Sequence, residues 1–207
     1  MDELASKSLC GLVSNVPEGM VPESDTANLA VMSYDPAVYS KGRSPLEAVS
    51  IGLNMDSDQT AFRCNVVTIS DSASLEDSIM LDHSADEITT DEADKIIKTI
   101  DEDLGTEKLE FNTGISYRHC LLWRDAPDFK DFVRPHDILG QRIGEHLPPE
   151  PFLSLIRQSR EILDNHPINV ARIARGLKPA NCIWLWSPGK KPTLPSFEEK
   201  WGLKASV

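Results

Sequence analysis

The sequence predicts a protein of the α/β class, because strand-like and helix-like patterns of apolar residues alternate along its 207 residues. Hydrophobic residues make up 40% of the chain, which excludes disorder throughout. No run of 18 apolar residues occurs, so we expect no transmembrane helix and no membrane partner. The four cysteines form no CxxC pair and the start lacks a signal peptide, which favours a cytoplasmic protein with reduced thiols.

The N-terminal segment holds several short elements. We expect a helix over residues 3–9, a short strand over 10–13, and a second helix over 26–32 after a loop with glycine and proline. A further helix begins at Ser44, where serine caps, proline takes the first helical position, and Glu47 closes a capping box. No earlier strand is present for these helices to pack on, which is unusual for a complete α/β domain.

The central segment carries the clearest periodicity. Residues 61–69 alternate with β-branched and aromatic side chains and predict a strand. Thr89 opens a helix whose apolar side chains recur on one face through Leu104. The other expected elements are strands over 78–81, 114–123 and 180–186, and helices over 151–164, 170–175 and 197–201.

These patterns divide the chain into three parts. Residues 50–189 are predicted to fold as one α+β domain, with a mixed sheet covered by helices. Residues 1–49 are predicted to be a fragment of a second domain. Residues 190–207, rich in lysine, proline and serine, are predicted to be a linker that returns to that second domain.

The net charge of −12 comes mainly from one segment. Residues 71–110 carry 14 acidic side chains and 3 lysines, and we interpret them as a solvated face. Such an acidic chain argues against nucleic acid as a partner. A small anionic ligand is not excluded, because a cluster of arginines acts locally.

Ser24 is the first candidate for chemistry. It precedes an expected helix, whose free N–H groups and dipole favour an anion. Its hydroxyl could be a nucleophile for phosphoryl transfer, activated by a metal because no histidine is nearby in the sequence. The alternative is that Ser24 or Asp25 only caps the helix.

Two arginines lie inside expected strands, Arg63 and Arg118. An arginine in a strand is costly to bury without a partner. Its planar guanidinium suits bidentate binding of phosphate or carboxylate. The alternative for each is exposure to solvent or an internal ion pair.

Two compact polar groups follow, Arg134-Pro135-His136-Asp137 and His166-Pro167-Ile168-Asn169 with Arg172. Either histidine could bind a ligand or act as an acid or base, and the alternative is that it caps a loop or helix end. Asp82 lies in the most acidic part and indicates nothing specific by itself.

Together these groups form a set of ordered motifs that runs through essentially the whole chain, and the set resembles the archaeal-type cofactor-independent phosphoglycerate mutases of the alkaline phosphatase superfamily. The motifs are, in order, Pro22-Glu23-Ser24-Asp25-Thr26-Ala27-Asn28, Ser33-Tyr34-Asp35-Pro36, Gly42-Arg43-Ser44-Pro45-Leu46-Glu47-Ala48, Ala61-Phe62-Arg63-Cys64-Asn65, Ser116-Tyr117-Arg118-His119, Pro135-His136-Asp137, His166-Pro167-Ile168-Asn169 with Arg172, and Pro179-Ala180-Asn181 before Trp184-Leu185-Trp186.

The resemblance implies a mechanism and a set of roles. The serine matched by Ser24 takes the phosphoryl group from phosphoglycerate, is a metal ligand, and returns the group to the neighbouring hydroxyl. Two divalent metal ions, expected to be manganese, activate it in the full-length enzyme. A lid domain inserted in the phosphatase-like core supplies substrate-binding arginines. The implied substrate-binding residues are Arg63, Arg118, His119, Asp137, His166 and Arg172, and the implied proton-handling residues are Asp82 and His136.

This chain departs from the family pattern at several points. The family begins with a strand ending in a metal-binding Asp-Gly, and further metal-binding residues follow the lid, but neither is present here. Near Asp82 the family pattern Ser-Ala-Gly-His is replaced by Ser84-Ala85-Asp86-Glu87, which weakens a proton-transfer role for that loop. We therefore expect a lid domain with short flanks of the core, either a truncated chain or the product of a fragmentary gene, that binds no metal and is inactive alone.

Two alternatives stay open. One is a related phosphotransferase of the same superfamily, resembling homoserine kinase or proteins labelled phosphonopyruvate decarboxylase. The other is a non-catalytic module that keeps an arginine pocket for its ligand. The sequence leaves the oligomeric state open.

Overall fold

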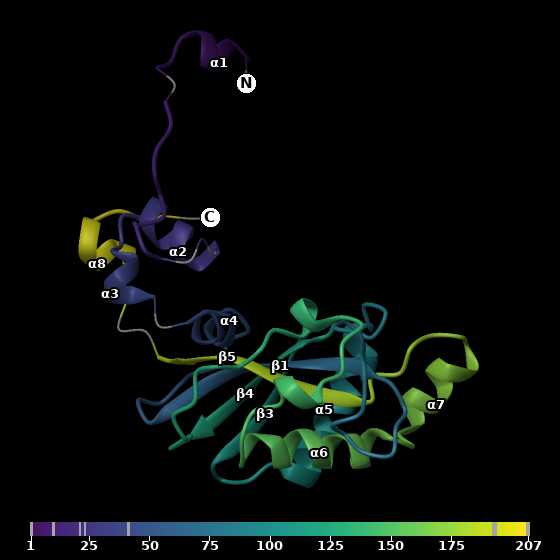
Figure 1. Ribbon diagram of the computed structural model, residues 1–207. Helices are drawn as coiled ribbons and strands as arrows, with labels where there is room; N and C mark the ends of the chain where they lie inside the picture. Colours follow the sequence, from purple (N-terminus) through teal and green to yellow (C-terminus); the bar gives the residue numbers. More distant parts are fainter. Residues whose placement is uncertain are drawn as a thin grey trace. The chain divides into compact units, whose positions relative to one another are not determined.

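The computed structural model (Figure 1) describes residues 2–9, 11–20, 22, 24–40, 42–191 and 194–205, except for the side chains of Ser24 and Asp25. The chain forms two compact units, Met1–Lys41 with Pro192–Val207, and Gly42–Lys191. The second unit begins before the boundary predicted after residue 49, so the helix at Ser44 belongs with the sheet. That the first unit belongs to a phosphatase-like core remains a prediction.

The unit Gly42–Lys191 is built on a five-stranded sheet whose central strand is β1 (Gln59–Ile69), buried along its whole length. Strand β1 pairs with β4 (Arg118–Arg124) and with β5 (Cys182–Lys190), and β4 pairs in turn with β3 (Leu109–Ile115). The short β2 (Met80–Asp82) joins the end of β1. The predicted combination of a sheet with helices is confirmed, but every described strand pair is antiparallel where we expected a mixed sheet.

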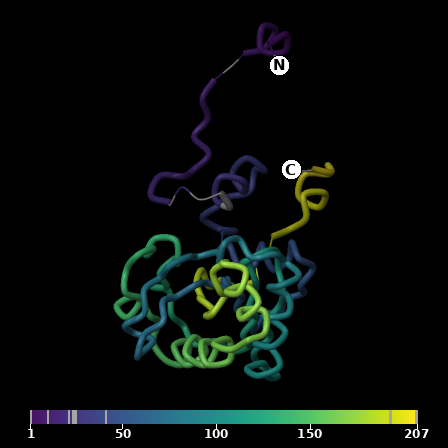
Figure 2. Tube along the Cα trace, turned by 90° about the vertical axis from the view of Figure 1, so that its right-hand side faces the viewer, coloured from purple at the N-terminus to yellow at the C-terminus, as the bar shows by residue number. Residues whose placement is uncertain are grey.

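Helices cover both faces of this sheet (Figure 1). On one face, α5 (Thr90–Leu104) and α6 (Phe152–Leu163) bury the main core, which includes Phe62 and Trp184. On the other face, α4 (Ser44–Ser50) packs Ala48 against Ala61, Cys120 and Leu122. Residues 42–191 gather into one body in two perpendicular views (Figures 1 and 2).

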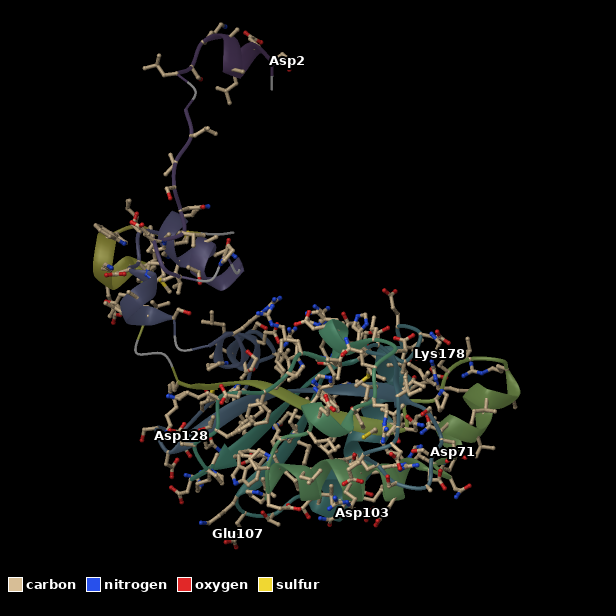
Figure 3. The ribbon with its side chains drawn as sticks, viewed as in Figure 1. Asp2, Asp71, Asp103, Glu107, Asp128 and Lys178 are labelled. Carbon is tan, nitrogen blue, oxygen red and sulfur yellow. The ribbon has the colours of Figure 1, made fainter. Side chains whose placement is uncertain are left out.

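The remaining elements of this unit are short. Helix α7 (Pro167–Ala174) follows α6, and the 3-10 helices η1 (Pro135–Ile138) and η2 (Gly144–His146) lie between β4 and α6 in the chain. The acidic residues of 71–110 are exposed or partly exposed, as expected of a solvated face. Figure 3 shows Asp71, Asp103 and Glu107 on the outside of the unit.

Two sequence predictions in this unit are wrong. The single strand predicted over 114–123 is a hairpin, because the chain turns at Ser116, where φ is 56°, and β3 precedes the turn. The capping box predicted at Ser44 is absent: Arg43 occupies the N-cap and makes no side-chain capping bond. Instead, the Ser44 hydroxyl donates to the Ser187 carbonyl of β5, and Glu47 turns toward two arginines.

The elements described in the unit Met1–Lys41 with Pro192–Val207 are helices joined by irregular segments. It contains α1 (Asp2–Ser6), α2 (Ser24–Val31), α3 (Pro36–Tyr39) and α8 (Phe197–Trp201). The Tyr34 hydroxyl donates to the Pro195 carbonyl at 2.9 Å, and the Lys200 ammonium lies 4.6 Å from the centre of the Tyr34 ring. The predicted strand over 10–13 is wrong for residues 11–13, and Cys10 lies outside the described residues.

None of the helices in the described part of the chain is long and apolar enough to cross a membrane.

Candidate functional site

Arg63 is the most unusual charged residue of the sheet. It lies in the middle of β1, opposite Cys120 of β4 and Trp186 of β5, and only 6% of its surface is exposed. Its guanidinium lies 4.5 Å above the Trp186 ring, and its Nε lies 2.7 Å from Oε2 of Glu47. This ion pair lacks hydrogen-bond geometry, and the buried Nε has no hydrogen-bond partner among the described residues. The side chain therefore keeps donors for an acceptor from outside the protein.

Burial is the main influence on Arg63, and it lowers the pKa of the guanidinium. The Glu47 carboxylate opposes this shift, whereas the positive charges of Arg43 and Arg118 add to it. Even so lowered, an arginine stays protonated near neutral pH. The result is a desolvated positive charge with incomplete compensation, a state that favours binding of an anion.

Aromatic rings and imidazoles surround this guanidinium. The Trp186 indole N–H donates to Oδ1 of Asn65 at 3.1 Å, and the His136 ring meets the Trp186 ring edge-on at 5.6 Å. His83 lies 6.0 Å from His136 and 5.6 Å from the ring of Tyr117. The η1 turn thus brings His136 to the same sheet face as Arg63, as the predicted site requires.

Arg118 begins β4 and is exposed. Its guanidinium lies 5.6 Å from the Tyr117 ring, and it pairs in register with Asn65 of β1. It lines a small cavity of about 160 Å³ together with Glu47, Ser50 and other residues of α4, β3 and β4. The structure therefore places Arg118 and Glu47 at one cavity.

Asp137 is the neighbour of His136 on η1. Its Oδ1 lies 3.8 Å from Nε2 of His136, and its Oδ2 lies 3.9 Å from Nε of Arg134. Burial lowers the pKa of His136, and the Asp137 carboxylate opposes this shift. His136 is thus mostly neutral near pH 7 and able to accept a proton.

His119 follows Arg118 in the chain and lines the same small cavity with Arg118 and Glu47. It pairs in register with Cys64 and is 4% exposed. Its Nδ1 accepts from the Gly114 N–H at 3.1 Å, and its Nε2 has no partner among the described residues. Burial lowers the pKa of His119 to about 3. The structure therefore places the predicted substrate-binding His119 as a buried, neutral side chain at the cavity that Arg118 and Glu47 also line.

Arg172 and Asp82 belong to a separate network around the loop after β2. Arg172, which is 2% exposed, donates from Nε to the Lys178 carbonyl at 2.9 Å, from Nη1 to Glu92, and from Nη2 to the Ala85 carbonyl. All three guanidinium nitrogens are thus bonded within the protein. Arg172 is thus committed to this network, and its predicted substrate-binding role stays a prediction.

Asp82 is held in the same network. Its Oδ1 accepts from the backbone N–H and the hydroxyl of Ser84, both at 2.8 Å, and its Oδ2 accepts from Lys178 Nζ at 2.7 Å. Burial opposes ionisation, but the hydrogen bonds from Lys178 and Ser84 hold the pKa of Asp82 well below its usual range. A carboxylate so stabilised is a weak proton acceptor at neutral pH.

His166 caps a helix, which was the alternative reading of its motif. It is the N-cap of α7, where its Nδ1 accepts from the Ile168 N–H at 3.3 Å, and its Nε2 lies 3.2 Å from the Thr99 hydroxyl. Burial lowers its pKa. The residue is committed to local structure, and no predicted site residue contacts it.

Ser24 is the first residue of α2, so the helix begins two residues before the predicted start at Thr26 and Ser24 does not precede it. Its side chain lies outside the described part. Its role as nucleophile or metal ligand stays a prediction. Within the described residues, no group of three or more histidine, cysteine, aspartate or glutamate side chains is placed to hold a metal ion.

Sequence reasoning missed several contributors to the Arg63 face. Asn65 stands two residues after Arg63, and this spacing on a strand places it on the same face. Glu47 was assigned to a capping box alone, because it fits that sequence pattern. His83 carries no signal in the sequence, and Tyr117 stood in a motif without a role of its own, since only the fold brings His83 between Tyr117 and His136.

A larger groove lies elsewhere on this unit. It has a volume of about 580 Å³ between residues 71–76 and α6. Its arginines are already engaged, Arg157 with Glu76 and Arg160 with the Ser72 carbonyl, both at 2.8 Å. It contains none of the predicted site residues.

Comparisons with known proteins agree on one family. The family model described as 2,3-bisphosphoglycerate-independent phosphoglycerate mutase matches residues 5–169. The protein of that name from Methanosarcina acetivorans is 42% identical over 212 residues, which cover 100% of this chain and 52% of the relative. A probable mutase of the same name from Geobacter sulfurreducens is 43% identical with the same coverage. The chain spans about half the length of these relatives.

Two solved structures share the fold. A cofactor-independent phosphoglycerate mutase from Thermoplasma acidophilum matches with a TM-score of 0.60 and 27% identity, over 86% of this chain and 49% of that one. The PH0037 protein from Pyrococcus horikoshii matches with a TM-score of 0.61 and 24% identity, over 91% of this chain and 43% of that one. At that lower identity the likeness concerns the fold alone.

Proposed function

We propose that this chain, which belongs to the family of 2,3-bisphosphoglycerate-independent phosphoglycerate mutases, supplies the substrate-binding part of an enzyme that interconverts 3-phosphoglycerate and 2-phosphoglycerate. The substrate carries a phosphate and a carboxylate, and a guanidinium binds either group through paired hydrogen bonds. We assign this binding to the sheet face around Arg63, Arg118 and His136.

One observation carries the proposal. The Arg63 guanidinium is almost completely buried, it is stacked on Trp186, and its buried Nε has no hydrogen-bond partner among the described residues. A protein that desolvates an arginine without satisfying its hydrogen-bond donors retains binding capacity for an anion. The exposed Arg118 beside it offers a second guanidinium for the other acidic group of the substrate.

The proposed reaction follows from the family resemblance. The Ser24 hydroxyl oxygen attacks the substrate phosphorus, and the bond from phosphorus to the substrate oxygen breaks. The phosphoryl group then passes from the serine to the neighbouring hydroxyl of the glycerate. His136, largely neutral near pH 7, is our candidate for moving the proton, and Asp82, ionised and bonded to Lys178, is the weaker one.

The two divalent metal ions that the resemblance implies do not fit the described residues of this chain, because no suitable cluster of ligands is present among them. In the proposed enzyme such ions would activate the serine and neutralise charge on the phosphoryl group. We expect their ligands to come from parts of the enzyme beyond these residues.

Binding of 3-phosphoglycerate to the 207-residue chain tests the proposal by isothermal titration calorimetry. We expect Arg63→Met to weaken binding at least tenfold, because it removes the desolvated charge that meets the anion. The matched control is Arg142→Met, since Arg142 is exposed and pairs only with Asp77. The control should bind as the parent chain does.

Two results would contradict the proposed function. One is unchanged binding in the Arg63 variant, and the other is 3-phosphoglycerate binding no better than inorganic phosphate. A preference for homoserine over phosphoglycerate would favour the related phosphotransferase instead.

A further inference from the structure

Glu47 stands among three arginines. Its Oε2 lies 2.7 Å from Nε of Arg63, and its Oε1 accepts from Nε of Arg43 at 3.0 Å. It also lines the small cavity that Arg118 lines. Both Arg43 and Arg118 act electrostatically on Arg63. One carboxylate thus contacts two guanidiniums and shares a cavity with a third.

The capping role that the sequence predicted for Glu47 does not apply. Glu47 closes no capping box, since Arg43 occupies the N-cap and makes no side-chain capping bond. Its carboxylate is also not needed to orient Arg63. The stacking on Trp186 and the packing of β1 between β4 and β5 already confine the guanidinium, and the contact with Glu47 lacks hydrogen-bond geometry.

What Glu47 supplies is negative charge. A phosphate or carboxylate of a ligand would supply the same charge with better geometry, because it could accept hydrogen bonds from the Arg63 guanidinium. Since the Glu47 side chain is about one-third exposed and is also bonded to Arg43, it can leave Arg63 without losing every partner. Two anions near the same guanidinium repel each other.

We propose that Glu47 is an internal substitute for the ligand's anionic group, which the ligand displaces from Arg63, so that Glu47 sets the affinity threshold of this site. The proposal rests on the proposed function, because it takes the Arg63 face as the phosphoglycerate site. In this proposal Glu47 competes with the ligand for Arg63 and does not help to bind it. Removal of its charge should therefore raise the affinity for the ligand, whereas a supporting Glu47 would predict a lower affinity.

The test uses the Glu47→Gln variant of the 207-residue chain, with inorganic phosphate as the probe. We expect phosphate to bind about tenfold more tightly by calorimetry, because a nearby repelling charge is removed. We expect the thermal midpoint without ligand to fall by about 3 °C, because Arg63 loses its counter-ion. A purely structural role for Glu47 would lower both affinity and stability.

The matched control is Glu102→Gln, which removes one exposed carboxylate of α5 and should change neither quantity. Glu47→Asp serves as the second variant, since it keeps the charge and withdraws it from Arg63. Its affinity should fall between those of the parent chain and the Gln variant.

Equal or weaker phosphate binding by Glu47→Gln, or by Glu47→Asp if the Gln variant does not fold, overturns the proposal. Absence of phosphate binding in all variants overturns it as well. If phosphate binding tightens but 3-phosphoglycerate shows no preference over phosphate, the proposed function fails while the role of Glu47 stands. If Arg63→Met abolishes phosphoglycerate binding but Glu47→Gln does not tighten phosphate binding, only the role of Glu47 fails.

Discussion

Arg172 donates from all three of its nitrogens to acceptors of the protein, whereas Arg63, which is nearly as buried, contacts one carboxylate and a tryptophan ring. Both arginines were candidates for the same role on the basis of their motifs. They differ in the hydrogen bonds that their guanidiniums make within the protein. A guanidinium whose three nitrogens all donate to the protein supports the fold, whereas one without such bonds can bind a ligand.

The largest expected effect concerns Arg172, whose three guanidinium nitrogens all donate to the protein. Arg172→Met should lower the free energy of unfolding by about 3 to 5 kcal/mol, because it leaves Glu92 and two carbonyls without their buried partner. Urea unfolding followed by circular dichroism measures this. Arg175→Met, which removes an exposed arginine from the same Glu92, should cost about 1 kcal/mol or less. Equal costs for the two variants would contradict the assignment.

His119 extends the comparison to a buried side chain that, unlike the two arginines, is neutral. Its pKa of about 3 in the folded state is below the unfolded value, so folding excludes a proton. The free energy of unfolding therefore keeps its full value above about pH 6.5 and decreases as the pH falls toward 3, because the unfolded chain binds the proton that the folded one excludes. Between pH 7 and pH 5 the parent chain should lose about 2 kcal/mol of unfolding free energy through this residue.

His119→Asn removes this loss, because its side-chain oxygen can still accept from the Gly114 N–H and does not titrate. Urea unfolding of the parent chain and the variant at pH 7 and pH 5 measures how much unfolding free energy each of them loses over this range. A variant that loses stability as steeply as the parent chain over this range would show that His119 is not the group responsible.

The smallest expected effect concerns Arg63, whose buried Nε has no hydrogen-bond partner among the described residues. Arg63→Met should change the free energy of unfolding by about 1 kcal/mol or less, because the lost ion pair is offset by the removal of a desolvated charge. The same urea experiment measures it beside Arg172→Met. A cost as large as that of Arg172→Met would remove the distinction between the two arginines.

Local patterns predicted the elements whose cause is local. The helix over 89–104 has its expected Thr89 cap, whose hydroxyl accepts from the Glu92 N–H, and α8 has the bounds that the sequence indicated. The hairpin turn at Ser116 was missed, because serine takes a left-handed conformation there without a glycine to signal it.

The site was only partly predictable for a related reason. Arg63 and Arg172 look alike in the sequence, and their difference depends on partners such as Glu92, which stands 80 residues before Arg172. Likewise, Glu47 fits a capping pattern with its neighbours, and only the arrival of β1 beneath α4 gives its carboxylate another partner. Residue type identified the candidates, and tertiary contacts assigned their roles.

The pairing of β1 with β5 has a consequence for the order in which this unit can assemble. Residues 59–69 are synthesised early. Their edge over residues 60–67 is closed only by residues 182–190, near the end of the unit, because β2 pairs with the last two residues of β1 alone. Until then a strand of buried residues exposes unpaired N–H and carbonyl groups, which invites pairing with another chain. Chains released before residue 190 should therefore aggregate, which makes β5 the element that protects the nascent protein.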